Sequence, residues 1–188
     1  MKKLILLFAI SIFVTSCSKN NLTTDESQKI LSSNYPKYYG DYGFGNEICP
    51  RIMEKAKKLE KEGYWKINTY KNNANCYGFQ ITEKGKPYVN KIGNYGGIRV
   101  NITESIFNNI EGVTMTSENK AEVIFTEIGI PSKFSIFTPN HSEEAKKWKR
   151  KAFFTKYDTG WQLDNIENGS LSENVMNLSE AYKELNLQ

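Results

Sequence analysis

AEVIFTEI at residues 121–128 and KAFFTKY at residues 151–157 decide the fold, because both are dominated by residues that favour β-strands. The second stretch runs into Asp158-Thr159-Gly160-Trp161, a tight turn whose glycine supplies the positive φ that such turns need. Ser117-Glu118-Asn119-Lys120 predicts another hairpin turn, just before the first stretch. Strands joined by such short turns form an antiparallel meander rather than alternating strands and helices.

The rest of the second half adds strands to this meander and ends in a helix. Alternating apolar and polar residues predict further strands at Gly97–Ile102, Gly112–Thr116, Lys133–Thr138 and Trp161–Leu163. A short helical turn is expected within Pro139–Trp148. Ser170-Leu171-Ser172-Glu173 has capping-box form, and apolar residues follow at helical spacing: Leu171, Val175, Leu178, Tyr182 and Leu185. This C-terminal helix either docks on the sheet or binds a partner or a second copy.

The first half contains a helix and then a hairpin. Asn46–Glu62 predicts the helix, with Pro50 in its first turn, Gly63 at its end, and one apolar stripe: Ile48, Ile52, Ala56 and Leu59. Tyr64–Lys71 and Cys76–Thr82 predict the two strands of the hairpin, joined by turn residues at 72–75.

The first seventeen residues predict where the protein is sent. Lys2 and Lys3 precede an apolar run, Leu4–Val14, which ends in Val14-Thr15-Ser16-Cys17. This is the layout of a secretory signal peptide. A run of eleven apolar residues is much shorter than the ~20 that span a bilayer, which argues against a membrane-spanning helix. An ordinary cleaved signal with a chance cysteine is the other alternative.

The cysteine after the small residues resembles the lipobox of bacterial lipoproteins. The resemblance implies that residues 1–16 are removed as a signal peptide and that Cys17 becomes lipidated, with palmitate as a typical acyl chain. Residues 17–33 would then be a polar tether, with a short helix near Asp25–Ser32. The family's sorting rule favours the outer membrane, facing the periplasm or the surface, because Ser18 rather than aspartate follows Cys17.

A second resemblance covers residues 46–90. The sequence Leu59-Glu60-Lys61-Glu62-Gly63-Tyr64, the hairpin after it, and Ile81-Thr82-Glu83-Lys84-Gly85-Lys86 resemble the last part of a winged-helix module. Such modules read DNA in the cytoplasm, a function that does not transfer to an exported chain. A generic helix and hairpin explain the same residues. The expected fold class is therefore α+β, with a winged-helix-like helix–hairpin subdomain at 34–90 and a strand-rich meander with a docked C-terminal helix at 91–188.

The small net charge of the chain argues against nucleic acid as a partner. The whole chain carries 25 basic and 21 acidic residues, and the loss of Lys2 and Lys3 with the signal leaves a net charge of only +2. The charge is uneven, because a basic strip runs from Lys146 to Lys156 without an acid. We interpret this strip as a solvated face or an interaction surface.

Two cysteines remain once Cys17 is assigned to lipid. In an oxidising compartment Cys49 and Cys76 favour one disulfide, and two buried free thiols are the alternative. Two cysteines and the single His141 lack the spacing of metal ligands, so neither a metal nor a cofactor is expected.

Residues 34–45 are unusually aromatic for a segment that also contains glycine and proline. We interpret them either as an ordered loop packed on the domain or as an aromatic patch for a glycan or a protein. Together with the basic strip they supply the candidate contact residues, namely Tyr35, Tyr38, Tyr39, Tyr42, Phe44, Lys147, Lys149 and Arg150.

Catalysis has no positive support in the sequence. His141 stands beside Ser142 and two glutamates, but the members of a catalytic triad come from separate elements. The acids Glu104, Glu111, Glu122 and Glu127 have no distinguishing context. Gly93-Asn94-Tyr95-Gly96-Gly97 lacks the ending of a phosphate-binding loop and predicts a loop between the two halves.

The expected function is that of a non-catalytic envelope lipoprotein, which binds another envelope component through its surface. A small-ligand-binding module with an apolar pocket is the first alternative. It rests on Tyr157-Asp158-Thr159-Gly160-Trp161-Gln162-Leu163, which is similar to the end of cone-shaped nuclear-transport-factor-2-like domains. An exclusion lipoprotein of a phage or plasmid is the second alternative. A hydrolase would need convergent carboxylates or a metal.

Overall fold

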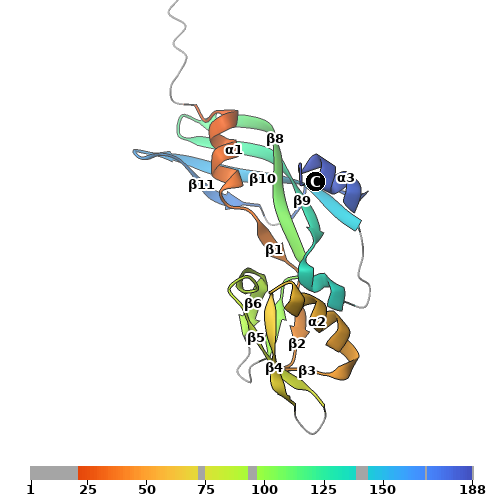
Figure 1. Ribbon diagram of the computed structural model, residues 1–188. Helices are drawn as coiled ribbons and strands as arrows, with labels where there is room; N and C mark the ends of the chain where they lie inside the picture. The colour runs from red at the N-terminus through yellow and green to blue at the C-terminus, as the bar shows by residue number, and fades with distance from the viewer. Residues whose placement is uncertain (1–20, 72–74, 93–96, 139–143, 168, 188) are drawn as a thin grey trace, which may run out of the picture.

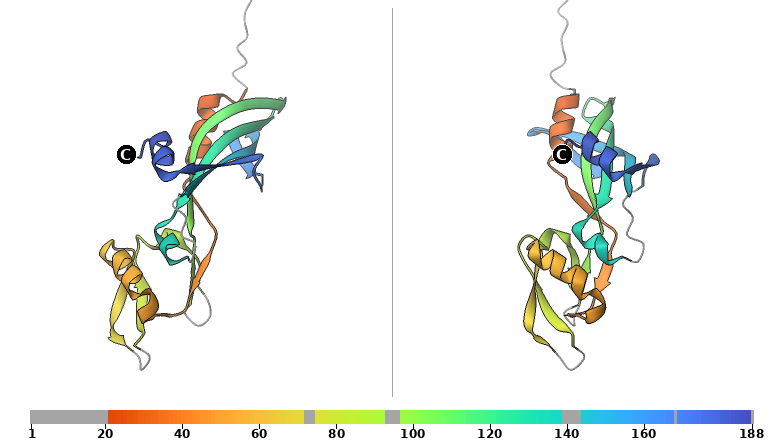
Figure 2. Two further views of the ribbon diagram at one scale, coloured as in Figure 1. Left: turned by 90° about the vertical axis from the view of Figure 1, so that its right-hand side faces the viewer. Right: turned by 45° about the vertical axis from the view of Figure 1, so that its right-hand side comes forward.

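Two antiparallel β units lie one above the other along a single long axis (Figure 1). The computed structural model describes residues 21–71, 75–92, 97–138, 144–167 and 169–187. The upper unit, which we call the sheet lobe, is a six-stranded curved sheet with helices α1 and α3 (Figure 2). The lower unit, the small lobe, holds two three-stranded sheets and helix α2. The fold class is therefore α+β, as predicted.

Four long strands of the sheet lobe follow one another in sequence and in space, which confirms the meander. The order β1-β8-β9-β10-β11 is antiparallel throughout, and β12 pairs with the free half of β10 beside β11. The strands are β1 (Lys37–Tyr39), β8 (Thr103–Ser117), β9 (Lys120–Pro131), β10 (Glu144–Tyr157), β11 (Gly160–Ile166) and β12 (Ser172–Asn177). Gly160 has the positive φ, +109°, that its turn requires.

Helix α1 (Thr24–Ser32) begins where the sequence predicts a helix, but it is not part of a tether. Thr23 caps it by accepting a hydrogen bond from the Glu26 amide. Leu22 and Leu31 are buried against the sheet, in a core with Val123, Phe125, Phe154 and Trp161. Residues from at least Leu22 onward therefore belong to the folded unit, because their apolar side chains are sheltered from water only there. The signal peptide, Cys17 and the first tether residues lie outside the described residues.

The C-terminal segment is half strand and half helix, so the prediction of one helix from Ser170 is wrong. Residues 172–177 form β12, because β10 extends beyond the end of β11 and leaves backbone groups that need a partner. Helix α3 (Leu178–Glu184) starts only after it, with a capping box formed by Asn177 and Glu180 instead of Ser170 and Glu173. Ala181 is fully buried against Ile128 and Ala145, so α3 is docked on the sheet.

Because side chains alternate along each strand, the curved sheet has two faces, and both carry buried residues. Odd-numbered residues of β9, such as Val123 and Phe125, face α1, and even-numbered Ile128 and Ile130 pack with the residues around α3. We call these faces the α1 face and the α3 face. The prediction of a strand at Lys133–Thr138 is wrong. That segment is a 3₁₀-helix, η3 (Lys133–Phe137), capped by Ser132, and it extends from the end of β9 into the small lobe.

The small lobe has its own core, centred on Trp65, Phe44, Phe134 and Phe137. One sheet has the order β2-β7-β6 and the other β3-β5-β4. Their strands are β2 (Tyr42–Phe44), β3 (Glu47–Ile48), β4 (Trp65–Lys71), β5 (Tyr77–Ile81), β6 (Val89–Ile92) and β7 (Ile98–Val100). The shorter helical segments are η1 (Pro50–Ile52) and η2 (Lys86–Tyr88). Strands β6 and β7, on either side of the boundary expected at residue 90, pair with each other and both contribute to this lobe.

The predicted helix at Asn46–Glu62 is correct only in its second half. Helix α2 runs from Met53 to Lys61, and its Ala56 and Leu59 are buried as the apolar stripe predicts. Ile48 instead lies in β3, which pairs with β5. The hairpin β4–β5 is confirmed, and Gly63 ends the helix with φ +82°. The Trp65 indole N–H donates to the Ala56 carbonyl oxygen at 2.7 Å, which joins hairpin and helix.

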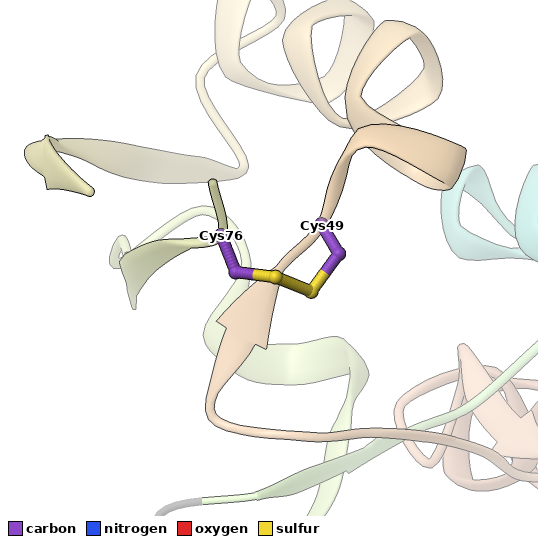
Figure 3. Close-up of a disulfide and its surroundings, with 2 residues drawn as sticks. All are labelled: Cys49 and Cys76. Atoms are coloured by element: carbon purple, nitrogen blue, oxygen red, sulfur yellow. A yellow bond between two sulfur atoms is a disulfide. The ribbon is translucent and has the colours of Figure 1, made fainter. Parts of the chain in front are cut away.

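The disulfide between Cys49 and Cys76 is present (Figure 3). It ties the end of β3 to the start of β5 across a sequence separation of 27 residues. Both the hairpin and the segment leading into α2 are thereby held to one another covalently. Among the described residues no helix is long and apolar enough to cross a membrane.

Candidate functional site

The five aromatic contact residues do not form one surface. Tyr38, Tyr42 and Phe44 pack in or against the core of the small lobe, and Tyr35 packs against the core of the sheet lobe. Tyr39 lines a cavity on the α1 face of the sheet, because alternation along β1 turns it away from Tyr38. The loop-packing interpretation therefore describes four of the five, and the two short strands β1 and β2 replace the expected loop.

The basic strip is likewise divided between the two faces of β10. Lys147 and Lys149 lie on the α3 face, where they form ion pairs with Glu184 at 2.5 Å and with Glu111 at 2.7 Å. Arg150 lies on the α1 face, where it pairs with Glu127 at 2.8 Å. The predicted helical turn at 139–148 is wrong from Glu144 onward, since this part is strand, and His141 lies outside the described residues. The strip is therefore a row of paired cations and not one continuous basic surface.

Arg150 and Glu127 form the most deeply buried charged group of the described chain. The Glu127 side chain is 0% exposed and that of Arg150 is 15% exposed. One carboxylate oxygen of Glu127 accepts a hydrogen bond from Arg150 Nε, and the other accepts one from the Tyr35 hydroxyl. A buried carboxylate without such partners would be strongly destabilising. Burial raises the pKa of Tyr35 far above its usual value, and the hydrogen bond to Glu127 raises it further.

In the sequence Glu127 is one of four acids without distinguishing context. A signal for it does exist in the strand. Glu127 continues the series Val123, Phe125 on the face that the alternation assigns to the core, and an acid at such a position needs a buried partner. The sequence does not identify that partner, because Tyr35 and Arg150 are far from Glu127 in the chain and meet it only in the folded structure.

Tyr39 and Trp148 form the walls of a cavity of about 360 Å³ on the same face. We call it the Tyr39–Trp148 cleft; it is lined by Tyr39, Ile102, Thr103, Gly129, Ile130, Pro131, Ser135, Thr138, Glu144, Lys146 and Trp148. The two rings meet edge to face, with centroids 6.3 Å apart. The cleft lies where the lower end of the sheet meets the segment of η3, so both lobes border it.

The Trp148 indole is held in place from two sides. Its ring lies so close to Gly129 that a Cβ there would come within 2.3 Å of Trp148 Cζ3. Its N–H donates to a carboxylate oxygen of Glu173 at 2.8 Å, and the Lys146 ammonium binds the other oxygen of Glu173 at 2.7 Å. The hydrogen bonds from Lys146 and Trp148 lower the pKa of Glu173. A rigid aromatic wall of this kind supplies binding area at a low entropic cost.

Ser105 is a further polar residue under this face. It lies opposite Lys37 of β1 and Gly129 of β9 in the sheet register. Its hydroxyl oxygen is completely buried and has no hydrogen-bond partner among the described residues. Such groups are uncommon in folded proteins and cost free energy.

The disulfide has an acid beside it. The Glu47 carboxylate and the two sulfur atoms lie within 4.8 Å of one another, which is the geometry of a small metal site. The sulfurs are bonded to each other, however, and a disulfide offers no thiolate to a metal. This group is a covalent link and not a metal centre.

The two aromatic walls and the polar side chains of the cleft are groups of the kind that hold and orient a ligand. Both carboxylate oxygens of Glu127 accept a hydrogen bond, one from Tyr35 and the other from Arg150, and the side chain is 0% exposed. No family model matches this chain, and no curated protein or solved structure is detectably similar to it.

Proposed function

We propose that the chain is a lipid-anchored protein of the bacterial envelope, without catalytic activity, which binds another envelope component in the Tyr39–Trp148 cleft. The observation that carries the binding role is the cleft itself. Two aromatic walls and a polar rim enclose about 360 Å³, which matches the lower range of ligand-binding cavities. The anchor rests on the lipobox Val14-Thr15-Ser16-Cys17 alone.

The bound component is expected to be a segment of a larger molecule rather than a free small ligand. Two lining residues of the cleft, Glu144 and Lys146, are exposed to solvent, so an occupant could continue beyond it. A cone-shaped ligand-binding domain would instead hold its ligand between helix and sheet. Here that space contains Leu31, Phe125 and Phe154, all 1% exposed or less. The small-ligand alternative therefore depends on the same cleft. The likeness of 46–90 to a winged-helix module adds no function to this proposal.

Site-specific photocrosslinking in living cells tests the binding role. A benzophenone amino acid replaces Tyr39, and in a matched control it replaces Tyr157, an aromatic residue of the same sheet that is 51% exposed. We expect one adduct of defined mass from position 39, identified by mass spectrometry as an envelope component, and its loss in the Trp148→Ala background. Equal adducts from both positions, or none from position 39, would contradict the proposal.

Metabolic labelling tests the anchor. We expect radiolabelled palmitate to enter the full chain and the label to be absent from Cys17→Ser, with Cys49→Ser as the control that keeps the label. A chain that takes up no palmitate, or takes up the same amount after Cys17→Ser, would refute the anchor while leaving the binding role open to its own test.

A further inference from the structure

A second cavity, of about 340 Å³, shares Tyr39 with the Tyr39–Trp148 cleft and no other lining residue. It is lined by Lys37, Tyr39, Arg150, Ile166, Glu167 and Gly169. Two of these six side chains are cations. The cavity therefore has an electrostatic character that the Tyr39–Trp148 cleft lacks.

The Arg150 guanidinium is held rigidly with part of its hydrogen-bonding capacity unused. Its Nε donates to Glu127, and its plane lies near two aromatic rings, with Cζ 6.0 Å from the Tyr39 centroid and 5.5 Å from the Trp148 centroid. Among the described residues no acceptor is bound to Nη1 or Nη2. Because Glu127 fixes the guanidinium through Nε, the two terminal nitrogens present a preorganised pair of donors.

Lys37 supplies the second positive charge. It lies on β1 two residues before Tyr39, so both side chains project from the same face of the sheet. Its ammonium lies 5.3 Å from the Tyr35 ring centroid and forms no ion pair with any described acid. Burial lowers the pKa of Lys37; Glu127 opposes this shift and Arg150 adds to it. An anion placed between the two cations would relieve their repulsion.

The remaining charged group of the cavity is Glu167, which is exposed. Water screens an exposed carboxylate more effectively than it screens the mostly buried Arg150. Glu127 also faces the cations, and its charge offsets that of Arg150, so Lys37 supplies the excess positive charge. The inner part of the cavity is therefore positive, and its outer part carries one acid that would weaken the binding of an anion.

We propose that this cavity binds an oxyanion, a phosphate or carboxylate group, between Arg150 Nη1 and Nη2 and Lys37 Nζ. The guanidinium fork matches two oxygens of such a group, and the ammonium provides a point charge beside them. The site would accept the anionic group of a ligand whose remaining part lies against Tyr39. This inference goes beyond the proposed envelope partner and does not depend on it.

Isothermal titration of the purified full chain in a non-ionic detergent, with inorganic phosphate and with acetate as probes, tests the site. We expect saturable binding of at least one probe, and the tighter one identifies the class of oxyanion. Lys37→Met should weaken binding at least tenfold while the Glu127–Arg150 pair stays intact. Glu167→Gln should strengthen it two- to fivefold, because the opposing charge is removed. Lys151→Met, which removes a partly buried cation paired with Glu122 at the next position of β10, should leave it unchanged.

A spectroscopic readout separates the site from general charge effects. The side-chain nitrogen resonances of Arg150 should shift with phosphate or acetate in the wild-type chain, and the midpoint should equal the calorimetric one. The proposal is overturned if neither probe binds, if Lys37→Met and Lys151→Met weaken binding equally, or if the Arg150 resonances do not move. None of these measurements requires an envelope partner, so a failed crosslinking experiment and a failed titration remain distinguishable.

Discussion

Arg150→Met should be one of the most damaging single substitutions in the sheet lobe. Methionine keeps the apolar stem but leaves the fully buried Glu127 carboxylate without its cation. Removal of one partner from a buried ion pair costs about 3–5 kcal/mol, because the remaining charge can neither reach water nor find a counterion. Glu127→Gln should cost less, about 1–2 kcal/mol, since the glutamine can still accept from Tyr35 and Arg150 is 15% exposed to water.

The double variant Glu127→Gln/Arg150→Met gives the decisive comparison. It contains no unpaired buried charge, so its loss of unfolding free energy should be at least about 2 kcal/mol smaller than the sum of the two single losses. Urea unfolding of the full chain in detergent, followed by far-ultraviolet circular dichroism, measures all three. The matched control is Lys151→Met, which removes a cation paired to Glu122 at 3.0 Å with both side chains about a third exposed, and should cost below about 1 kcal/mol. Equal losses for Arg150→Met and Lys151→Met, or strict additivity in the double variant, would refute the reasoning.

Three further outcomes are expected. Ser105→Ala should leave the midpoint of thermal unfolding unchanged or raise it, because it removes a buried hydroxyl that has no partner among the described residues; a clear loss of stability would mean that the hydroxyl is bonded. Above about pH 10, where an unfolded tyrosine loses its proton while the raised pKa keeps Tyr35 protonated in the fold, the unfolding free energy should fall as pH rises. Tyr35→Phe should reduce that slope by up to about 1.4 kcal/mol per pH unit, and an unchanged slope in alkaline urea titrations would contradict the assignment. The double variant Cys49→Ser/Cys76→Ser should lose about 3.5 kcal/mol, the chain-entropy value for a loop closed across 27 positions, in the same urea assay.

Local patterns predicted those parts of the fold that local physics determines. The turns at 117–120 and 158–161 and the central strands were identified because strand alternation and turn residues act over a few positions. The prediction of a helix at residues 171–178 was wrong because their apolar spacing fits a helix, whereas the half of β10 not paired with β11 needs a pairing strand. The prediction of a strand at residues 133–138 was wrong because so short a segment fits either structure. The two buried rings, Phe134 and Phe137, are three residues apart, which matches one turn of a 3₁₀-helix.

The candidate site was predicted only in fragments. Tyr39 and Arg150 were named as contact residues, but for an exposed patch and a basic strip that do not exist as such. Their joint position depends on the register between β1, β8, β9 and β10, which no local pattern specifies. The disulfide was predictable because the number of cysteines, together with the expected lipidation of Cys17, leaves only one possible pair.

The early start of α1 limits how far the protein can stand from a membrane. If Cys17 carries the lipid, six residues separate it from the first residue of the helix, Thr24, and the seven Cα-to-Cα steps span about 25 Å when fully extended. The chain enters the sheet lobe at the end that points away from the small lobe (Figure 1). The anchor would then be a short linker. It would hold the sheet lobe beside the lipid headgroups and turn the disulfide-linked small lobe outward, as the part of the molecule that a partner on the opposite side meets first.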